Sequence, residues 1–156
     1  MQIILTWSKP QSRQIAAFFR EWLKEVVPGV EPWMSEEDLE KGKQWFDSLM
    51  GQLGVTSTCI ICVTRENVDS PWIHFEAGAI AMKQGQGGVF PYLIGVEPGE
   101  LAGGPLALFQ CTRADRSDTW RLVRDINRSI AKSHTLFWRR WPTCGKPRIG
   151  FSPWGR

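Results

Sequence analysis

Five short apolar segments alternate along the chain with segments of helical periodicity, and this alternation constrains the fold more than any other feature. The strongest apolar segment, STCIICVT at 57–64, reads as a strand that is covered on both faces. The pattern predicts strands at 3–7, within 28–34, and at 57–64, 89–96 and 108–114, and helices at 11–26, 44–53, 70–84 and 118–132. Such alternation favours an α/β fold. For five strands we expect a flavodoxin-like three-layer domain whose parallel sheet has the order 2-1-3-4-5. Pro91 indicates that the fourth strand is irregular or less central.

The length and composition are those of one globular domain. The chain has 156 residues, of which 42% are hydrophobic and 22% are charged. No apolar run approaches the roughly 20 residues that span a bilayer, and the first residues lack a signal-peptide pattern. We therefore expect a cytoplasmic protein without a membrane span.

The positive net charge belongs to the end of the chain. Residues 134–156 carry five basic side chains and no acidic one, so residues 1–133 carry −2 within a total of +3. We predict a domain at 1–133 and a basic, aromatic C-terminal extension at 134–156, and we do not expect the domain itself to bind nucleic acid. The extension either folds back on the domain or offers its side chains to RNA, a membrane surface or a partner protein.

Cys59 and Cys62 form a C-x-x-C pattern inside a predicted strand. Residues three apart on a strand point to opposite faces, so these thiols cannot hold one metal ion together. A redox C-x-x-C pair normally begins a helix instead. We interpret both cysteines as core residues and predict no metal site.

The predicted strand order places a binding crevice at the carboxyl ends of strands 1 and 3, where the winding direction reverses. Trp7 and Ser8 end the first strand there, and the third strand leads into a helix with Ser70 as its N-cap. Glu76 lies less than two turns into that helix, and no cation stands three or four positions from it. Such an acid serves either catalysis or a structural tie to distant backbone or arginine. No G-x-G-x-x-G pattern is present, so a dinucleotide would not be held in the Rossmann manner.

Three motifs follow one another in the predicted domain: IILTWS at 3–8, WMSEEDLEKGKQW at 33–45 and SPWIHFEAGA at 70–79. The first is similar to the first-strand box of bacterial TIR (Toll/interleukin-1 receptor) domains, and the second to the loop after their second strand. The third carries, as Trp72 and Glu76, the W-x-x-x-E pattern of the members that cleave NAD+. The resemblance covers about 1–133 and implies the TIR fold.

In the NAD-cleaving members the glutamate of this pattern is catalytic, which by resemblance is Glu76. Breaking the nicotinamide–ribose bond produces an oxocarbenium-like transition state. The cationic pyridinium ring leaves as neutral nicotinamide, so no general acid is required. A single carboxylate held where positive charge develops can therefore suffice. NAD+ is the expected substrate, and no cofactor is predicted. The candidate substrate-binding residues are Trp7, Ser8, Trp33, Ser35, Leu39 and Trp72. The alternative roles for these residues are core packing, turn capping and a place in a solvated loop.

The resemblance leaves two functions open. The first is an NAD+ nucleosidase or ADP-ribosyl cyclase, acting in bacterial anti-phage immunity by NAD+ depletion or signal production. The second is a non-catalytic adaptor module. Expected partners are further TIR domains, through the loop 35–43 with Leu39 at its centre, and a separate sensor or effector protein. The chain lacks the sequence signatures of a flavodoxin-like FMN domain and those of a phospho-receiver domain.

Overall fold

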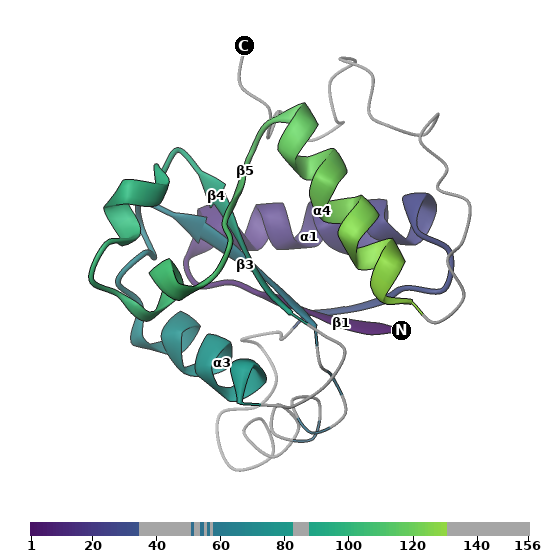
Figure 1. Ribbon diagram of the computed structural model, residues 1–156, viewed down its shortest axis with the longest axis horizontal. Helices are drawn as coiled ribbons and strands as arrows, with labels where there is room; N and C mark the ends of the chain where they lie inside the picture. Colours follow the sequence, from purple (N-terminus) through teal and green to yellow (C-terminus); the bar gives the residue numbers. More distant parts are fainter. Residues whose placement is uncertain (35–50, 52–53, 55, 57, 83–87, 131–156) are drawn as a thin grey trace.

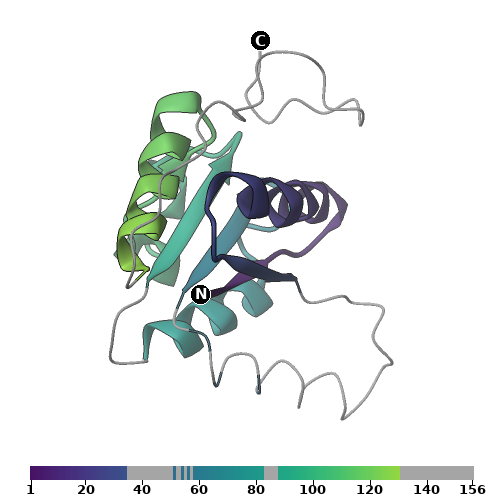
Figure 2. The same cartoon turned by 90° about the vertical axis from the view of Figure 1, so that its right-hand side faces the viewer.

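The structure, a computed structural model, describes residues 1–34, 51, 54, 56, 58–82 and 88–130. A five-stranded sheet lies between two helical layers (Figures 1 and 2). Helices α1 (Pro10–Val26) and α4 (Arg116–Ser129) cover one face, and α3 (Pro71–Ala81) covers the other. Among the helices described, none is long and apolar enough to cross a membrane.

The sheet has the strand order β2-β1-β3-β4-β5, and each neighbouring pair is parallel. This confirms the predicted fold class and strand order. The strands are β1 Gln2–Thr6, β2 Glu31–Met34, β3 Cys59–Thr64, β4 Val89–Ile94 and β5 Thr112–Arg113. Since β1 has β2 on one side and β3 on the other, the winding direction reverses between β1 and β3.

Strand β3 is buried at every position, because helices cover both faces of the sheet. Its residues alternate between two apolar clusters. Cys62 belongs to the cluster under α1 and α4, and Cys59 belongs to the cluster under α3. The two cysteines therefore point to opposite faces, as predicted, and burial raises the pKa of both thiols.

Helix α4 begins earlier than predicted because Asp115 caps it. The Asp115 carboxylate accepts hydrogen bonds from the backbone N–H groups of Ser117 (2.8 Å) and Asp118 (2.9 Å). These bonds keep the pKa of Asp115 below its usual range, and the bond from Asp118 has the larger effect. The predicted helix at 44–53 lies outside the described residues, apart from residue 51.

The prediction of a fifth strand at 108–114 is wrong in its first half, because β5 contains only Thr112 and Arg113. Two 3₁₀ helices, η1 (Pro98–Leu101) and η2 (Pro105–Leu108), precede it. Leu106 is buried and Leu108 is 84% exposed. In a strand these two residues would share a face, so their opposite environments reflect the turn that Pro105 begins.

Pro91 lies inside β4, one strand away from the β5 edge. The Gly88 carbonyl accepts a hydrogen bond from β3, and the Leu93 carbonyl accepts one from Ala114. Peptide groups alternate along a strand, so Pro91 shares the orientation of Leu93 and turns its nitrogen away from β3. Because β5 pairs with β4 only beyond Pro91, the missing N–H removes no ladder hydrogen bond.

Deletion of residues 134–156, which lie outside the described residues, is expected to change the melting temperature by less than about 4 °C, or roughly 1 kcal/mol. The helices and strands predicted from the sequence all end before His134, so we expect the extension to add little to the core. Differential scanning calorimetry of the full and shortened chains measures the change. A much larger drop would mean that the aromatic residues of the extension pack into the domain.

Candidate active site

Asn67 joins the carboxyl ends of β1 and β3, where the crevice is predicted. Its side-chain nitrogen donates to the carbonyls of Ser8 (2.9 Å) and Cys62 (3.0 Å). Its side-chain oxygen accepts from the backbone N–H of Thr64 (2.8 Å). With only 1% of its surface exposed, Asn67 satisfies backbone groups of two strands that end there.

Asn67→Ala is expected to lower the free energy of unfolding by about 2–4 kcal/mol, because the Thr64 N–H and the Cys62 carbonyl lose this buried partner and the Ser8 carbonyl is left with the Ser12 hydroxyl. Urea denaturation measures the loss. The control is Glu66→Ala in the same segment, whose side chain is exposed and whose removal is expected to change stability by less than about 0.5 kcal/mol. Equal stability of the two variants would show that Asn67 does not hold the strand ends together.

Helix α3 begins beside this junction. Ser70 occupies the N-cap position, as predicted, and Pro71 follows it. The Ser70 hydroxyl donates to the Ser8 hydroxyl (3.3 Å) and does not cap the helix. Ser8 also donates its backbone N–H to the Ser12 hydroxyl (3.1 Å). Ser8 thus links the end of β1 to the starts of both α1 and α3.

Lys9 follows with φ of 80° and ψ of 156°. This backbone conformation favours glycine and costs a lysine on the order of 1–3 kcal/mol. Strained backbone of this kind occurs at functional sites more often than elsewhere. Its position three residues after the end of β1 agrees with a site at this end of the sheet.

Glu76 lies on the face of α3 that packs against the sheet, together with Ile73, Ala77 and Ile80. Its side chain has no exposed surface. Neither carboxyl oxygen has a partner at hydrogen-bond distance within the described part of the chain. An acid buried in an apolar layer without a cation is costly to ionise. The structural tie to an arginine therefore finds no support among the described residues.

Burial raises the pKa of Glu76 from its ordinary value of 4.5 to about 8. The Thr6 hydroxyl and the Trp72 indole act in the opposite direction, because both favour the ionised carboxylate. Burial outweighs them. Glu76 in turn contributes, after burial, to the raised pKa of the neighbouring Cys59. At pH 7 the carboxyl group is therefore mostly protonated.

The structure brings two of the predicted aromatic residues to the face where Glu76 lies. Trp72, one turn before Glu76, and Trp33 of β2 are both half-buried against the cluster under α3. The Trp72 ring also contacts Phe75, with 5.5 Å between the ring centres. These two tryptophans could border a ligand that approaches the carboxyl group.

Trp7, another predicted site residue, lies on the opposite face of the sheet. Trp7 is 4% exposed and packs in the cluster under α1 and α4, so it does not join Glu76. The Arg13 guanidinium lies 5.4 Å from the centre of its ring, at cation–π distance. Ser35 and Leu39 lie outside the described residues.

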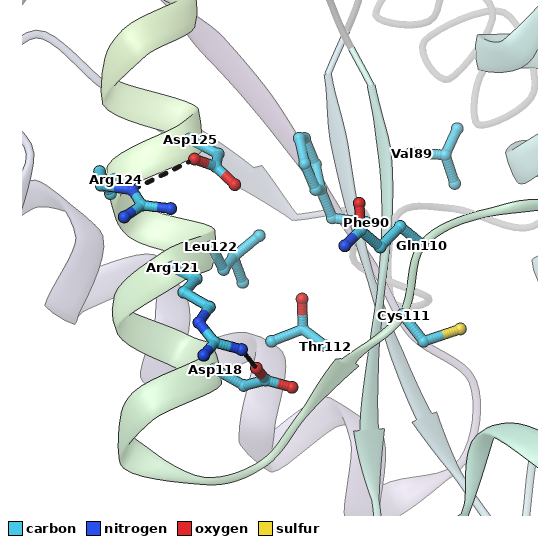
Figure 3. A pocket seen from close by; sticks show the side chains of 10 residues that line it. All are labelled: Val89, Phe90, Gln110, Cys111, Thr112, Asp118, Arg121, Leu122, Arg124 and Asp125. Carbon is cyan, nitrogen blue, oxygen red and sulfur yellow. Dashed lines mark hydrogen bonds and ion pairs between the residues drawn. The ribbon is translucent and has the colours of Figure 1, made fainter.

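A pocket of about 190 Å³ lies at the other end of the sheet order, between α4 and the β4–β5 edge (Figure 3). Its rim carries the ion pairs Arg121–Asp118 (3.0 Å) and Arg124–Asp125 (3.4 Å). It includes none of the predicted site residues. Among the described residues, no group of three or more histidine, cysteine or acidic side chains gathers as in a metal site.

Sequence reasoning missed Thr6 and Asn67. Thr6 is fully buried at the end of β1, and its hydroxyl acts against the burial that raises the pKa of Glu76. The motif IILTWS drew attention to Trp7 and Ser8, although the alternation along β1 turns Thr6 toward α3. A polar residue at the last position of an otherwise apolar strand, at the switch point, is the signal that could have identified it.

In a comparison with known families, the family model of the TIR domain aligns with residues 3–133. This range contains every helix and strand that the structure describes except Gln2 of β1. A comparison with curated proteins gives no match.

Proposed function

Because the chain belongs to the TIR domain family, we propose that it is an enzyme that cleaves the nicotinamide–ribose bond of NAD+ and that Glu76 is its catalytic residue. The observation that supports this most is the environment of Glu76. A fully buried acid, with no described cation or hydrogen-bond partner, destabilises the fold when it ionises. Such a group is hard to explain by stability alone, and perturbed acids of this kind concentrate in active sites.

The chemistry needs only one carboxylate. Nicotinamide leaves as a neutral molecule, so the positive charge that develops on the ribose is the charge to be stabilised. A carboxylate in apolar surroundings interacts with that charge far more strongly than one in water. Glu76 carries out this role in its ionised form, and binding of the cationic nicotinamide ring would itself favour ionisation.

The substrate must reach a carboxyl group that has no exposed surface in the structure. We propose that NAD+ enters from the carboxyl ends of β1 and β3, past Trp72 and Trp33. Either aromatic ring could stack on nicotinamide or adenine. The Ser8 hydroxyl, at the same end, could bind ribose or phosphate in place of its present partner Ser70. Ser35 and Leu39 complete the proposed set of substrate-binding residues, whereas Trp7 serves packing.

The direct test is incubation of the purified protein with NAD+, with nicotinamide and nucleotide products separated by chromatography. We expect release of nicotinamide, together with linear ADP-ribose, a cyclic isomer or another nucleotide. Either class of product would fit the proposed role in bacterial anti-phage immunity, as NAD+ depletion or as a signal. Absence of nicotinamide release across pH 6–9 and at high protein concentration would contradict the proposal.

The alternative is a TIR interaction module that carries out no chemistry, and one observation favours it. The outward side of α3 carries no charged residue, although it meets solvent. Phe75 is 42% exposed, and Met82, directly after the helix, is 84% exposed. Exposed apolar residues grouped on one helix are typical of protein interfaces. The incubation with NAD+ decides between the two functions.

Self-association through the loop 35–43 is a further part of the proposal. If contacts between copies complete the site, specific activity is expected to rise with protein concentration, and high salt is expected to weaken the rise because it screens exposed charges. Leu39→Asp is expected to abolish the rise while leaving the melting temperature unchanged. Specific activity that is independent of concentration in both proteins would show that the single chain is competent.

A further inference from the structure

Helix α3 is apolar on the side turned away from the sheet as well as on the side that packs against it (Figure 1). Its 11 residues include no lysine, arginine or aspartate, and its one glutamate, Glu76, is buried. A helix that is apolar all round is normally covered on all sides. Yet Phe75 is 42% exposed, and Met82, directly after the helix, is 84% exposed. The described part of the chain thus leaves an apolar surface of α3 open.

The exposed residues follow the spacing of a helix–helix contact. Pro71, Phe75, Gly78 and Met82 are all exposed, and successive members stand four, three and four positions apart. This spacing places them along one stripe of the helix, and it equals the a/d spacing through which two helices pack side by side. We call these four residues the outer seam. Ala81, which is also exposed, lies beside it.

Gly78 lies in the middle of the outer seam, and the fold itself does not require a glycine there. A Cβ atom added at Gly78 would meet no other atom within 4 Å. The position is helical, and a helix is less stable with glycine than with alanine. Glycine does, however, allow another backbone to approach closely. Gly78 therefore points to a contact with another molecule.

The residues beside the outer seam favour a second copy of the chain as this molecule. When two different helices pack together, charged residues beside the seam select the partner through ion pairs. Here the neighbouring positions hold Trp72, His74, Ala79 and Ala81, so lysine, arginine and acidic residues are absent from both sides of the seam. In a two-fold contact the same patch meets itself. A seam without such charges meets itself without repulsion.

We propose that two copies of the chain associate through the outer seam, with their α3 helices antiparallel about a two-fold axis between Gly78 and Ala79. Phe75 and Met82 are equally far from this axis along the helix, so Phe75 of one protomer lies opposite the partner's Met82. A thioether in contact with an aromatic ring is favourable. The small residues at the axis let the two backbones approach closely.

The dimer is expected to be weak, because one helix of 11 residues offers a smaller contact than a stable interface needs. Glu76 lies on the opposite side of the same helix, against the sheet, and takes no part in the contact. The outer seam is also separate in sequence from the loop 35–43. The proposed dimer therefore depends neither on NAD+ cleavage nor on association through that loop.

Sedimentation velocity of the full chain, from micromolar to submillimolar concentration, measures the association. The wild-type protein is expected to show a concentration-dependent equilibrium between monomer and dimer. Gly78→Gln is expected to raise the dissociation constant by about tenfold or more, because its side chain fills the space that the partner's helix occupies. Leu39→Asp, which alters the loop 35–43, is expected to dimerise through α3 like the wild type.

Gly99→Gln is the matched control. Gly99 is also exposed, and a Cβ atom added there likewise meets no other atom within 4 Å, but it lies in η1 rather than on α3. Its dissociation constant is expected to equal that of the wild type. Equal dissociation constants for Gly78→Gln and Gly99→Gln overturn the proposal.

Gly78→Ala separates the contact from an effect on folding. Since alanine favours a helix and the added methyl group meets open space, the melting temperature of dilute protein is expected to rise by about 2–4 °C. The dimer is nevertheless expected to weaken a few-fold. Weaker association of a more stable protein cannot result from misfolding. A dimer that tightens in Gly78→Ala would contradict close approach at this residue.

Two further outcomes overturn the proposal. A full chain that stays monomeric at every concentration means that the outer seam serves another occupant, either the extension 134–156 or a different protein. A dimer that Leu39→Asp abolishes belongs to the loop 35–43. Because none of these measurements uses NAD+, a failure of the proposed dimer leaves the proposed function unaffected, and the reverse also holds.

Discussion

Glu76→Gln is expected to reduce NAD+ turnover by about 10²-fold or more while leaving the protein folded. Glutamine has nearly the same shape, so it fills the same space on the buried face of α3. It cannot carry a negative charge, and loss of one preorganised charge contact to a transition state has effects of this size. Rates of nicotinamide release, measured near pH 9 where the wild-type acid is ionised, provide the comparison.

The control is Glu66→Gln, the same chemical change at an exposed position in the segment before α3. Turnover by this variant is expected to equal that of the wild type. If the folded Glu76→Gln variant also retained wild-type turnover, Glu76 would not be the catalytic residue, and the adaptor function would become the better explanation.

The stability of the wild-type protein is expected to fall as the pH rises from about 5 to 8. Glu76 has a pKa of about 8 in the folded state against 4.5 ordinarily, so above pH 4.5 the unfolded chain releases a proton that the folded protein keeps. The stabilisation is complete below pH 4.5 and is lost as the pH rises through about 8. The loss is on the order of 4 kcal/mol in the free energy of unfolding.

Glu76→Gln removes this titration, so its stability is expected to vary much less over the same range and to exceed that of the wild type at pH 8–9. Urea denaturation at pH 5, 7 and 9 measures both proteins, and Glu66→Gln again serves as the control. The other titrating groups contribute equally to all three proteins. Parallel pH profiles for wild type and Glu76→Gln would mean that the folded carboxyl group ionises normally.

Much of the architecture follows from local patterns in the sequence. The alternation of apolar and periodic segments predicts the five parallel strands and their order, because short right-handed crossovers leave few arrangements for such a chain. The period-2 rule also separates Cys59 from Cys62. It fails for the start of β5, where a turn begun by Pro105 replaces the expected extended chain.

The candidate site depended more on tertiary contacts. The sequence by itself determined that Glu76 lies on a helix after the third strand, without a cation three or four positions away. Only the tertiary structure decided that this acid is fully buried and that neither of its carboxyl oxygens has a hydrogen-bond partner among the described residues. Likewise, Trp7 belongs to the opposite face and Asn67 joins two strand ends. The reason is physical: desolvation and hydrogen bonding depend on which groups the folded sheet and helices bring together, and these groups are not neighbours in sequence.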